Sequence, residues 1–262
     1  MNSKPYISII VSTLNCSGSI ENCLASLMRQ SFRSLEIIVV DGGSTDGTVE
    51  LLEAHSEELD WWCSEQDHGI YDAWNKGIKA STGEWLCFLG ADDVLAGDTV
   101  LEVMISELEK AETSEHRLVY SPIALVNQKG EILEVRGKSN FYVEWQLNHG
   151  MPKDIPHTGM LHRRSIFEEH GMFDADFAIA GDYDLILREL KSNKNSLLFV
   201  DKAILVSKGT GGISDTNRPQ CIKEFHKARK KNNMRAATIP WCAVYIRAMI
   251  RQNLLKITNW GQ

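Results

Sequence analysis

The sequence lacks the apolar runs that a membrane span requires. No stretch of its 262 residues approaches the roughly 20 consecutive apolar residues that cross a bilayer. The first residues, 1–5, are polar and lead directly into a strand-like segment, so we expect no signal peptide. These two absences favour a cytoplasmic protein.

The six cysteines lack the C-x-x-C spacing of zinc sites and redox motifs. We therefore expect free thiols in a reducing compartment, and neither a disulfide framework nor a zinc site. Four histidines of the second half lack the spacing of metal ligands, and we interpret them as structural or solvent-facing. They are His149, His157, His162 and His170.

Motifs of several large enzyme classes are absent as well. The glycine-rich turn 42–47 does not have the G-x-G-x-x-G spacing of dinucleotide-binding proteins. The chain has no Walker A motif, no G-x-S-x-G and no H-E-x-x-H. Dinucleotide-binding oxidoreductases, P-loop enzymes, α/β-hydrolases and zinc metalloproteases are therefore disfavoured.

The net charge of −7 argues against a general nucleic-acid partner. The charge is unevenly placed: from Lys223 to the C-terminus, nine lysines and arginines accompany a single acid, Glu224. We expect a catalytic domain at 1–235 and a basic tail at 236–262, with a helix over 240–257. The tail would lie on an anionic membrane surface, or pack on the body or on a second subunit of a homo-oligomer.

Hydrophobic residues (43%) and charged residues (24%) stand in the ordinary proportions of a globular protein. The first half alternates short β-branched runs with helical periodicity, which predicts parallel βαβ units. The second half carries the pattern of an antiparallel hairpin. We therefore predict a single α/β domain with a mixed, mainly parallel sheet flanked by helices. The expected strands are 8–13, 35–40, 85–89, 119–120, 123–126 and 132–135, with a strand-rich segment at 197–206; the expected helices lie at 20–28, from 49, 70–80, 100–108, 165–170 and 182–190.

Acidic residues follow directly on two of these strands. Asp41 follows 35–40, Asp92 and Asp93 follow 85–89, and a third acidic cluster lies at 65–67. Because ligands of an open α/β sheet bind outside the carboxyl ends of its strands, we expect these carboxylates to converge. Mg²⁺ or Mn²⁺, held by one or two carboxylates and by phosphate oxygens, would relieve their repulsion.

Other polar residues have plainer interpretations. We read Asp46 and Asp98 as helix caps, and the segment Ser165 to Glu168 as a capping box before a helix that Gly171 ends. Most tryptophans are interpreted as core residues.

Several motifs occur in a fixed order, and the ordered set resembles the inverting glycosyltransferases of family 2, which have the GT-A fold. The resemblance covers roughly residues 6–226 and is much more specific than any one motif. The matching segments are 8–15 (SIIVSTLN), 39–48 (VVDGGSTDGT), 67–77 (DHGIYDAWNKG), 83–93 (GEWLCFLGADD), 155–157, 163–167 and 173–188.

The resemblance implies roles for individual residues. Asp41 would read the nucleotide base, and Asp67 would be a second acid of the nucleotide pocket. Asp92 and Asp93 would hold the ribose and the metal bound to the diphosphate. Asp182 would be the catalytic base. We also expect Thr13, Asn15 and Lys76 to be among the residues that bind the donor.

Two positions depart from the family pattern. Members often carry a second aspartate where this chain has Gly42, and an acid or asparagine where it has Gly90. The metal would then depend on Asp92 or Asp93, and the sequence does not decide between them.

Asp182 begins a predicted helix, and the positive end of that helix is expected to keep its pKa low and its carboxylate ionised at pH 7. Lys76, Lys208 and Arg188 are candidate partners of the donor phosphates, although surface charge is the plainer reading. The glycine-rich segment 208–214 could form a loop that closes over the donor.

The sequence thus predicts a metal-dependent inverting glycosyltransferase that uses a nucleotide sugar, with a UDP-sugar favoured. The expected acceptor is a lipid-linked saccharide at the cytoplasmic face of the inner membrane, in the assembly of a surface polysaccharide such as lipopolysaccharide. One alternative is a sugar-nucleotide pyrophosphorylase, which the segment 13–18 disfavours because it lacks a basic residue. Another is a protein of this fold that binds nucleotide or glycan without turnover.

Overall fold

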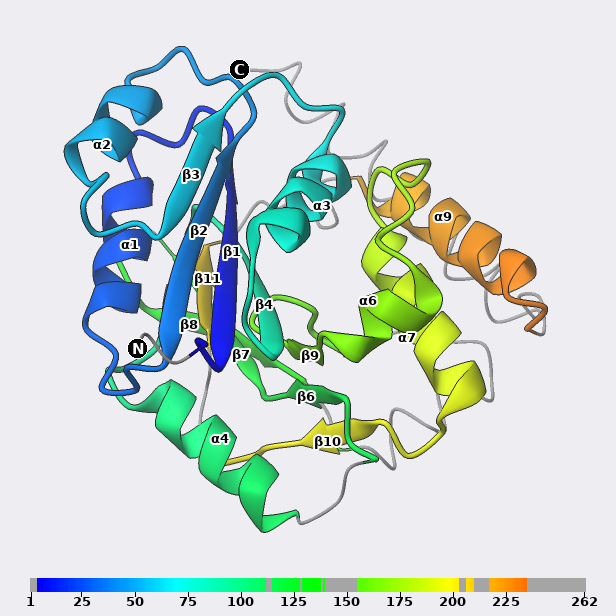
Figure 1. The fold of residues 1–262 in the computed structure, drawn as a ribbon. Coiled ribbons are helices and arrows are strands. Elements are labelled where there is room, and N and C mark those ends of the chain that lie inside the picture. Colours follow the sequence, from blue (N-terminus) through cyan, green and yellow to red (C-terminus); the bar gives the residue numbers. More distant parts are fainter. Residues whose placement is uncertain are drawn as a thin grey trace.

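The computed structural model describes residues 4–111, 115–127, 129–137, 139, 155–202, 206–209 and 217–234. Its first half alternates strands and helices as predicted, and these elements build one side of a seven-stranded sheet (Figure 1). The tail at 236–262 and most of the loop at 208–214 lie outside the described residues. The elements of the first half are β1 (Ile7–Thr13), α1 (Ile20–Met28), β2 (Leu35–Asp41), α2 (Thr48–Ala54), β3 (Trp61–Ser64), α3 (Ile70–Ala80) and β4 (Trp85–Gly90).

The large sheet has the strand order β10-β6-β9-β4-β1-β2-β3. The strands β4, β1, β2 and β3 are parallel, whereas β9 (Leu161–Arg163) runs antiparallel to both β4 and β6 (Leu118–Tyr120). At the far end, β10 (Leu197–Phe199) pairs in parallel with β6. The prediction of a mixed, mainly parallel sheet is confirmed.

A second sheet of four strands lies beside the first, in the order β5-β11-β7-β8. It contains the predicted hairpin, formed by β7 (Ile123–Val126) and β8 (Ile132–Arg136). The strand β11 (Val206–Gly209) pairs with β7 and with β5 (Asp93–Leu95), which directly follows the acidic end of β4. The expected metal-binding residues therefore lie where the chain passes from β4 of the large sheet to β5 of the second sheet, and Asp93 is the first residue of β5.

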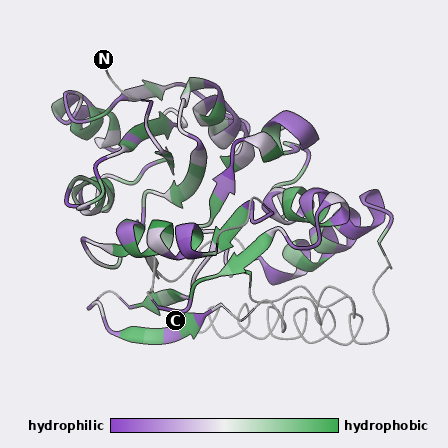
Figure 2. Ribbon diagram, turned by 60° about the horizontal axis from the view of Figure 1, so that its bottom comes forward, coloured by the Kyte–Doolittle hydropathy of each residue, from purple (hydrophilic) through white to green (hydrophobic). Residues whose placement is uncertain are grey.

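Helices cover both faces of the large sheet. Ile7, Ile9 and Val11 of β1 pack in one core with side chains of α1, α2 and α4 (Val100–Lys110). Ile10 points to the other core, with α3, α6 (Ser165–His170) and α7 (Gly181–Ser192). Because β4 is covered on both faces, it is apolar without alternation. In Figure 2 the helices carry both hydrophilic and hydrophobic residues.

Some local predictions are wrong. Asp98 does not cap α4: it is exposed and pairs with Arg29 at 3.4 Å, while the residue before the helix is Thr99. Ser165 is itself the first residue of α6, so no capping box forms. Asp46, in contrast, accepts a hydrogen bond from the N–H of Thr48, the first residue of α2.

Gly171 ends α6 with a positive φ of 76°, as expected. Trp61 is 38% exposed, so it is not a core residue. The short strands β3, β5 and β9 were not predicted; three or four residues carry little periodicity, although the equally short β6 was recognised.

The described cysteines and histidines have the structural roles that were predicted, whereas His149 and Cys242 lie outside the described residues. The five cysteines among the described residues are free thiols. His157 and His162 lie in a buried aromatic cluster with Phe88, and burial lowers the pKa of His157 to about 3. In the part of the chain that the structure describes, no helix is long and apolar enough to cross a bilayer.

The contact between α3 and β1 leads to a stability prediction. A Cβ added at Gly77 would lie 2.3 Å from Cγ2 of the buried Ile10. Because a packed core accommodates an extra methyl group poorly, Gly77→Ala should lower the free energy of unfolding by about 1–3 kcal/mol. Gly18→Ala is the matched control, since a Cβ there meets no atom within 4 Å. Urea denaturation of the two variants tests this, and equal midpoints would contradict it.

Candidate functional site

The carboxyl ends of the four parallel strands form a row, as the sequence predicted. Thr13 is the register partner of Asp41, which is in turn the partner of Ser64. On the other side, Ser12 of β1 pairs with Gly90 of β4. The acidic segments that follow β2, β3 and β4 therefore leave the sheet at the same edge, where α/β proteins bind ligands.

Asp41 is buried at the centre of this row, with no exposed surface. One carboxylate oxygen accepts hydrogen bonds from the backbone N–H groups of Gly43 and Ser44 and from the Ser64 hydroxyl, at 3.0, 2.9 and 2.7 Å. The other accepts one from the Ser44 hydroxyl at 2.5 Å. A carboxylate has about four acceptor positions, so the turn itself uses those of Asp41. This geometry fixes the turn after β2 and leaves little capacity for a nucleotide base.

Asp67 lies against the turn after β2. A Cβ at Gly42 would come within 2.6 Å of Asp67 Oδ2, so the carboxylate occupies the space that a side chain at 42 would need. Its other oxygen accepts a hydrogen bond from the Gly69 N–H at 2.9 Å, which orients it at the start of α3. The departure at Gly42 therefore has a physical consequence: it admits the carboxylate of Asp67.

The end of β4 shows the same relation. A Cβ at Gly90 would lie 2.8 Å from Asp92 Oδ1 and 3.4 Å from Asp93 Oδ2. Asp92 is exposed, whereas Asp93 is 1% exposed and accepts a hydrogen bond from the Gly90 N–H at 2.9 Å. Asp92 thus presents its carboxylate at the edge, and Asp93 holds the turn that carries it.

The loop after β1 is tied to the turn after β2. Asn15 has a positive φ of 51°; its side-chain oxygen accepts a hydrogen bond from the Thr45 N–H at 2.9 Å, and its own N–H donates to the Ser44 hydroxyl at 2.7 Å. Thr13 is 4% exposed, and its hydroxyl has no hydrogen-bond partner among the described residues. A buried hydroxyl in that state is suited to a ligand that would complete its bonding.

Lys76 extends from α3 toward the loop after β3. Its ammonium group lies 3.0 Å from Glu65 and 3.6 Å from Asp72, and it donates to the Gln66 carbonyl. Its place beside Asp67's loop is compatible with a phosphate contact, in which the phosphate would compete with these acids.

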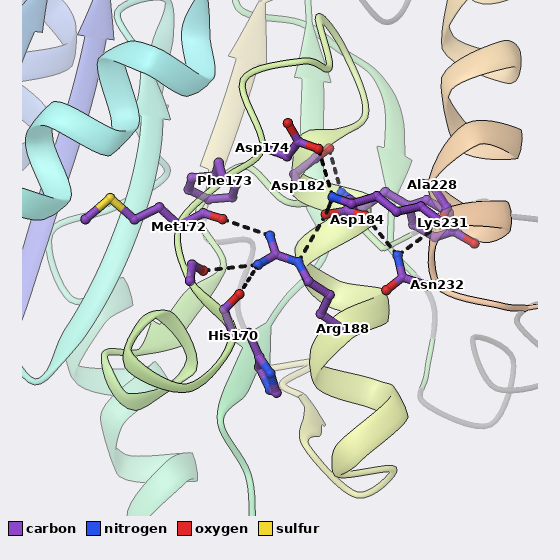
Figure 3. A network of polar contacts seen from close by, with 12 residues as sticks. His170, Met172, Phe173, Asp174, Asp182, Asp184, Arg188, Ala228, Lys231 and Asn232 are labelled. Atoms are coloured by element: carbon purple, nitrogen blue, oxygen red, sulfur yellow. Dashed lines mark hydrogen bonds and ion pairs between the residues drawn. The ribbon is translucent and has the colours of Figure 1, made fainter.

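Arg188 has a different task from the phosphate contact that was considered for it. Its guanidinium donates to the carbonyls of His170, Gly171 and Met172 and pairs with Asp184 at 3.1 Å, so it holds the loop after α6 onto α7 (Figure 3). Of Lys208 the structure describes only the backbone, which belongs to β11.

Asp182 lies in the first turn of α7 and is partly buried. The Tyr71 hydroxyl of α3 lies 3.0 Å from its Oδ1 and 2.6 Å from the Ile179 carbonyl. Gly181 makes this approach possible, because a Cβ there would lie 2.9 Å from the tyrosine ring. A carboxylate is thereby held between the N-terminal ends of α3 and α7.

The pKa of Asp182 differs from the low value that was expected. Burial raises it to about 6, although hydrogen bonds from the Tyr183 N–H and the Tyr71 hydroxyl act in the opposite direction. The low value was expected from the positive helix end alone. The cost of desolvating the charged carboxylate, which raises the pKa, is the larger effect here. A carboxylate with this pKa is ionised at neutral pH and is a better proton acceptor than an ordinary aspartate.

Ser64 and Tyr71 were missed as site residues by the sequence reasoning. Tyr71 lies within the segment 67–77 that carries the family resemblance, so its position was available as a signal. Ser64 had no comparable signal, since the strand that ends with it was not predicted.

The residues at this edge fit a divalent cation only if the donor diphosphate supplies some of its ligands. Among the residues that the structure describes, no three His, Cys, Asp or Glu side chains are grouped closely enough to hold a metal by themselves. The exposed carboxylate of Asp92 offers oxygen ligands, which Mg²⁺ and Mn²⁺ prefer, and these ions commonly take one or two carboxylates together with substrate phosphates. The donor set therefore fits a metal that is bound with the diphosphate.

Comparison with known proteins relates the chain to glycosyltransferases in sequence and in structure. The family profile described as Glycosyl transferase family 2 matches residues 8–171. A PGL/p-HBAD biosynthesis glycosyltransferase of Mycobacterium tuberculosis is 29% identical over 215 residues, which cover 81% of this chain and 80% of the relative. A protein named as an uncharacterized glycosyltransferase of the same species is 31% identical over 189 residues, covering 72% and 70%.

Solved structures share the fold at low sequence identity. TarS 1-349 of S. aureus, in complex with UDP-GlcNAc, matches with a TM-score of 0.65 and 17% identity, over 87% of this chain and 65% of that one. A longer TarS chain is matched over 39% of its length. The mannosyltransferase PcManGT of Pyrobaculum calidifontis, in complex with GDP-Man and Mn²⁺, gives a TM-score of 0.64 and 16% identity, over 95% and 70%.

These neighbours confirm the predicted GT-A architecture. The family match also decides against a sugar-nucleotide pyrophosphorylase. The chain belongs to glycosyltransferase family 2 and is an inverting glycosyltransferase that transfers a sugar from a nucleotide-sugar donor.

Proposed function

We propose that the protein transfers a sugar from a UDP-sugar to a saccharide hydroxyl, with Asp182 as general base and with Mn²⁺ or Mg²⁺ bound at Asp92. The observation that carries this proposal is the partly buried carboxylate of Asp182, which Tyr71 holds at the start of α7 and whose pKa burial raises to about 6. The UDP and GDP donors and the Mn²⁺ bound by the structural neighbours support the donor and metal assignments.

On the donor side, the chain's own residues bind and orient the nucleotide. The imide N–H of uracil needs an acceptor, and Asp67 Oδ2 beside Gly42 offers one, while Asp41 keeps the turn beneath it in place. Asp92 would hold the metal, which supplies positive charge to the departing diphosphate. Lys76 would add a second positive charge near the same loop.

On the acceptor side, Asp182 accepts the proton of the attacking hydroxyl. The attack on the anomeric carbon is a single in-line displacement that inverts its configuration, and the proton leaves as the new bond forms. Below a pH of about 6 the carboxyl of Asp182 is protonated and cannot act, so activity should fall on the acidic side of that pH.

We further propose that the acceptor is a lipid-linked saccharide of surface-polysaccharide assembly, met at the cytoplasmic face of the membrane. The proposal is supported by the basic composition of the tail at 236–262, since each lysine or arginine near an anionic surface contributes about 1 kcal/mol of attraction.

Replacing the base tests the central assignment. Asp182→Asn should reduce turnover by about 10²–10⁴-fold, the usual contribution of a general base, while UDP affinity stays unchanged. Asp176→Asn, an exposed aspartate of the loop before α7, is the matched control and should behave like the wild type. Hydrolysis of UDP-glucose, UDP-galactose and UDP-GlcNAc with Mn²⁺ measures turnover, and calorimetry with UDP measures affinity. Equal losses in both would place Asp182 in the nucleotide pocket instead.

Nucleotide recognition separates the two acids near β2. Asp67→Ala should lower the affinity for UDP more than the affinity for CDP, because cytosine lacks the imide N–H that would donate a hydrogen bond to the carboxylate. Asp41→Asn should lower the melting temperature and weaken both nucleotides equally, because it disrupts the turn. Calorimetry with UDP and CDP, together with thermal melting, distinguishes these results. Loss of the preference for UDP in Asp41→Asn, but not in Asp67→Ala, would reverse the assignment.

Metal dependence is tested at the end of β4. Asp92→Asn should weaken UDP binding in the presence of Mn²⁺ and leave the weaker binding in EDTA unchanged, because the exposed carboxylate acts through the metal. Asp93→Asn should lower thermal stability as well, since it releases the turn at Gly90. Undiminished activity of the wild type in EDTA would exclude a metal from the reaction.

A further inference from the structure

We propose that Glu224 of α9 (Arg218–Lys231) is a positioning residue for the general base, because it holds the backbone segment 178–180, which leads into the first turn of α7 where Asp182 lies. This inference rests on the proposed role of Asp182. It assigns a task in the reaction to a helix that lies outside the family profile, which ends at residue 171.

The carboxylate of Glu224 binds three successive backbone N–H groups. Its oxygens accept hydrogen bonds from Ala178, Ile179 and Ala180 at 3.2, 2.7 and 3.0 Å. Gln220, one turn earlier on α9, donates to the same carboxylate at 2.9 Å and fixes its orientation. Glu224 is 5% exposed, so these bonds form in a desolvated setting where an unpaired charge would be costly.

The same segment is held from its other side by the residue that contacts the base. The Tyr71 hydroxyl lies 2.6 Å from the Ile179 carbonyl and 3.0 Å from Asp182. Glu224 thus binds the N–H groups of this segment, and Tyr71 lies against a carbonyl of it. The position of Asp182 relative to the tyrosine depends on both contacts, because only Gly181 separates Ala180 from Asp182.

Helix α9 is itself anchored firmly to α7. The ring of Phe225 packs edge-on against Tyr183 with 4.7 Å between centroids, and Arg229 donates to the Tyr183 hydroxyl at 3.1 Å. At the C-terminal end of α9, Lys231 and the next residue, Asn232, bind the buried Asp184 at 3.1 and 2.8 Å (Figure 3). These contacts fix the place of Glu224, so that its carboxylate acts as a rigid acceptor.

Glu224 also acts on Asp182 through its charge. The titratable groups that face Asp182 are Tyr71 from α3 and Glu224 from α9, and the negative charge of Glu224 raises the pKa of Asp182 in addition to burial. Burial alone would raise the pKa of Glu224 as well, but the hydrogen bonds from Gln220 and the three N–H groups lower it below its usual value. Glu224 therefore stays ionised while Asp182 titrates, and the two carboxylates keep separate tasks.

Two substitutions separate the hold on the backbone from the effect of the charge. Glu224→Ala removes both, and we expect turnover to fall by about 10²-fold with unchanged UDP affinity, as for a base displaced by about 1 Å. Glu224→Gln keeps an acceptor oxygen and loses the charge. Its turnover should fall less, and the acidic limb of its pH–rate profile should move to lower pH, because the pKa of Asp182 decreases when the neighbouring negative charge is gone.

Glu189→Gln is the matched control. Glu189 is a second buried glutamate, on α7 itself, and it binds Ser196 and His170 rather than the segment before Asp182. The same change there should lower the melting temperature without moving the acidic limb. Turnover is measured as hydrolysis of UDP-glucose, UDP-galactose and UDP-GlcNAc with Mn²⁺ from about pH 4.5 to 8, a range that brackets a carboxylate of raised pKa. Calorimetry measures UDP affinity. The titration of Asp182 is followed by its carboxyl carbon resonance in protein labelled with ¹³C-aspartate.

The inference is overturned if Glu224→Gln leaves both the acidic limb and the Asp182 resonance titration where they are in the wild type. It is equally overturned if Glu224→Ala loses UDP affinity in parallel with turnover, because that pattern indicates general disruption. If Glu224→Ala does not fold, the Glu224→Gln titration decides. Failure of the proposed base shows separately, as full turnover in Asp182→Asn.

Discussion

The buried carboxylate of Asp41 is the constraint on which the proposed donor half of the site depends. A carboxylate without solvent contact is tolerated only when its oxygens are hydrogen-bonded, and the turn after β2 provides those bonds with backbone N–H groups and two serine hydroxyls. The turn in turn binds the loop after β1 through Asn15. One buried charge thus organises the chain at the ends of two neighbouring strands.

The two glycines that depart from the family pattern belong to the same arrangement. At Gly42 and Gly90 the missing side chain is replaced by a neighbouring carboxylate, from Asp67 and Asp92 respectively. The site thereby places acids at the strand ends through Asp67, which comes from the loop after β3, and Asp92, which lies two residues after Gly90 in the same turn. When the family pattern is compared position by position, these glycines mean that two carboxylates are missing. The structure nevertheless places a carboxylate near each of them.

Much of the fold and the location of the site could be predicted from the sequence, but the state of the individual residues could not. Strands β1, β2 and β4 are long or strongly apolar, and the rule for parallel sheets places Asp41 and Asp92 at one edge. The strand β3 has four residues and went unrecognised. The hydrogen bonds that occupy Asp41, and the burial that raises the pKa of Asp182, depend on residues distant in sequence: Ser64 is 23 positions from Asp41, and Tyr71 is 111 positions from Asp182.

The sequence distances of these contacts bear on the order in which the enzyme can be assembled. The proposed donor half is made within the first 93 residues, from parallel strands whose pairings join residues 23 to 78 positions apart. The base half joins α3 to α7 and then to Glu224, about 45 positions further on. A chain still emerging from the ribosome can therefore complete the donor half well before α9 has been made. The backbone segment that precedes Asp182 can gain its hydrogen bonds to Glu224 only after α9 has been made.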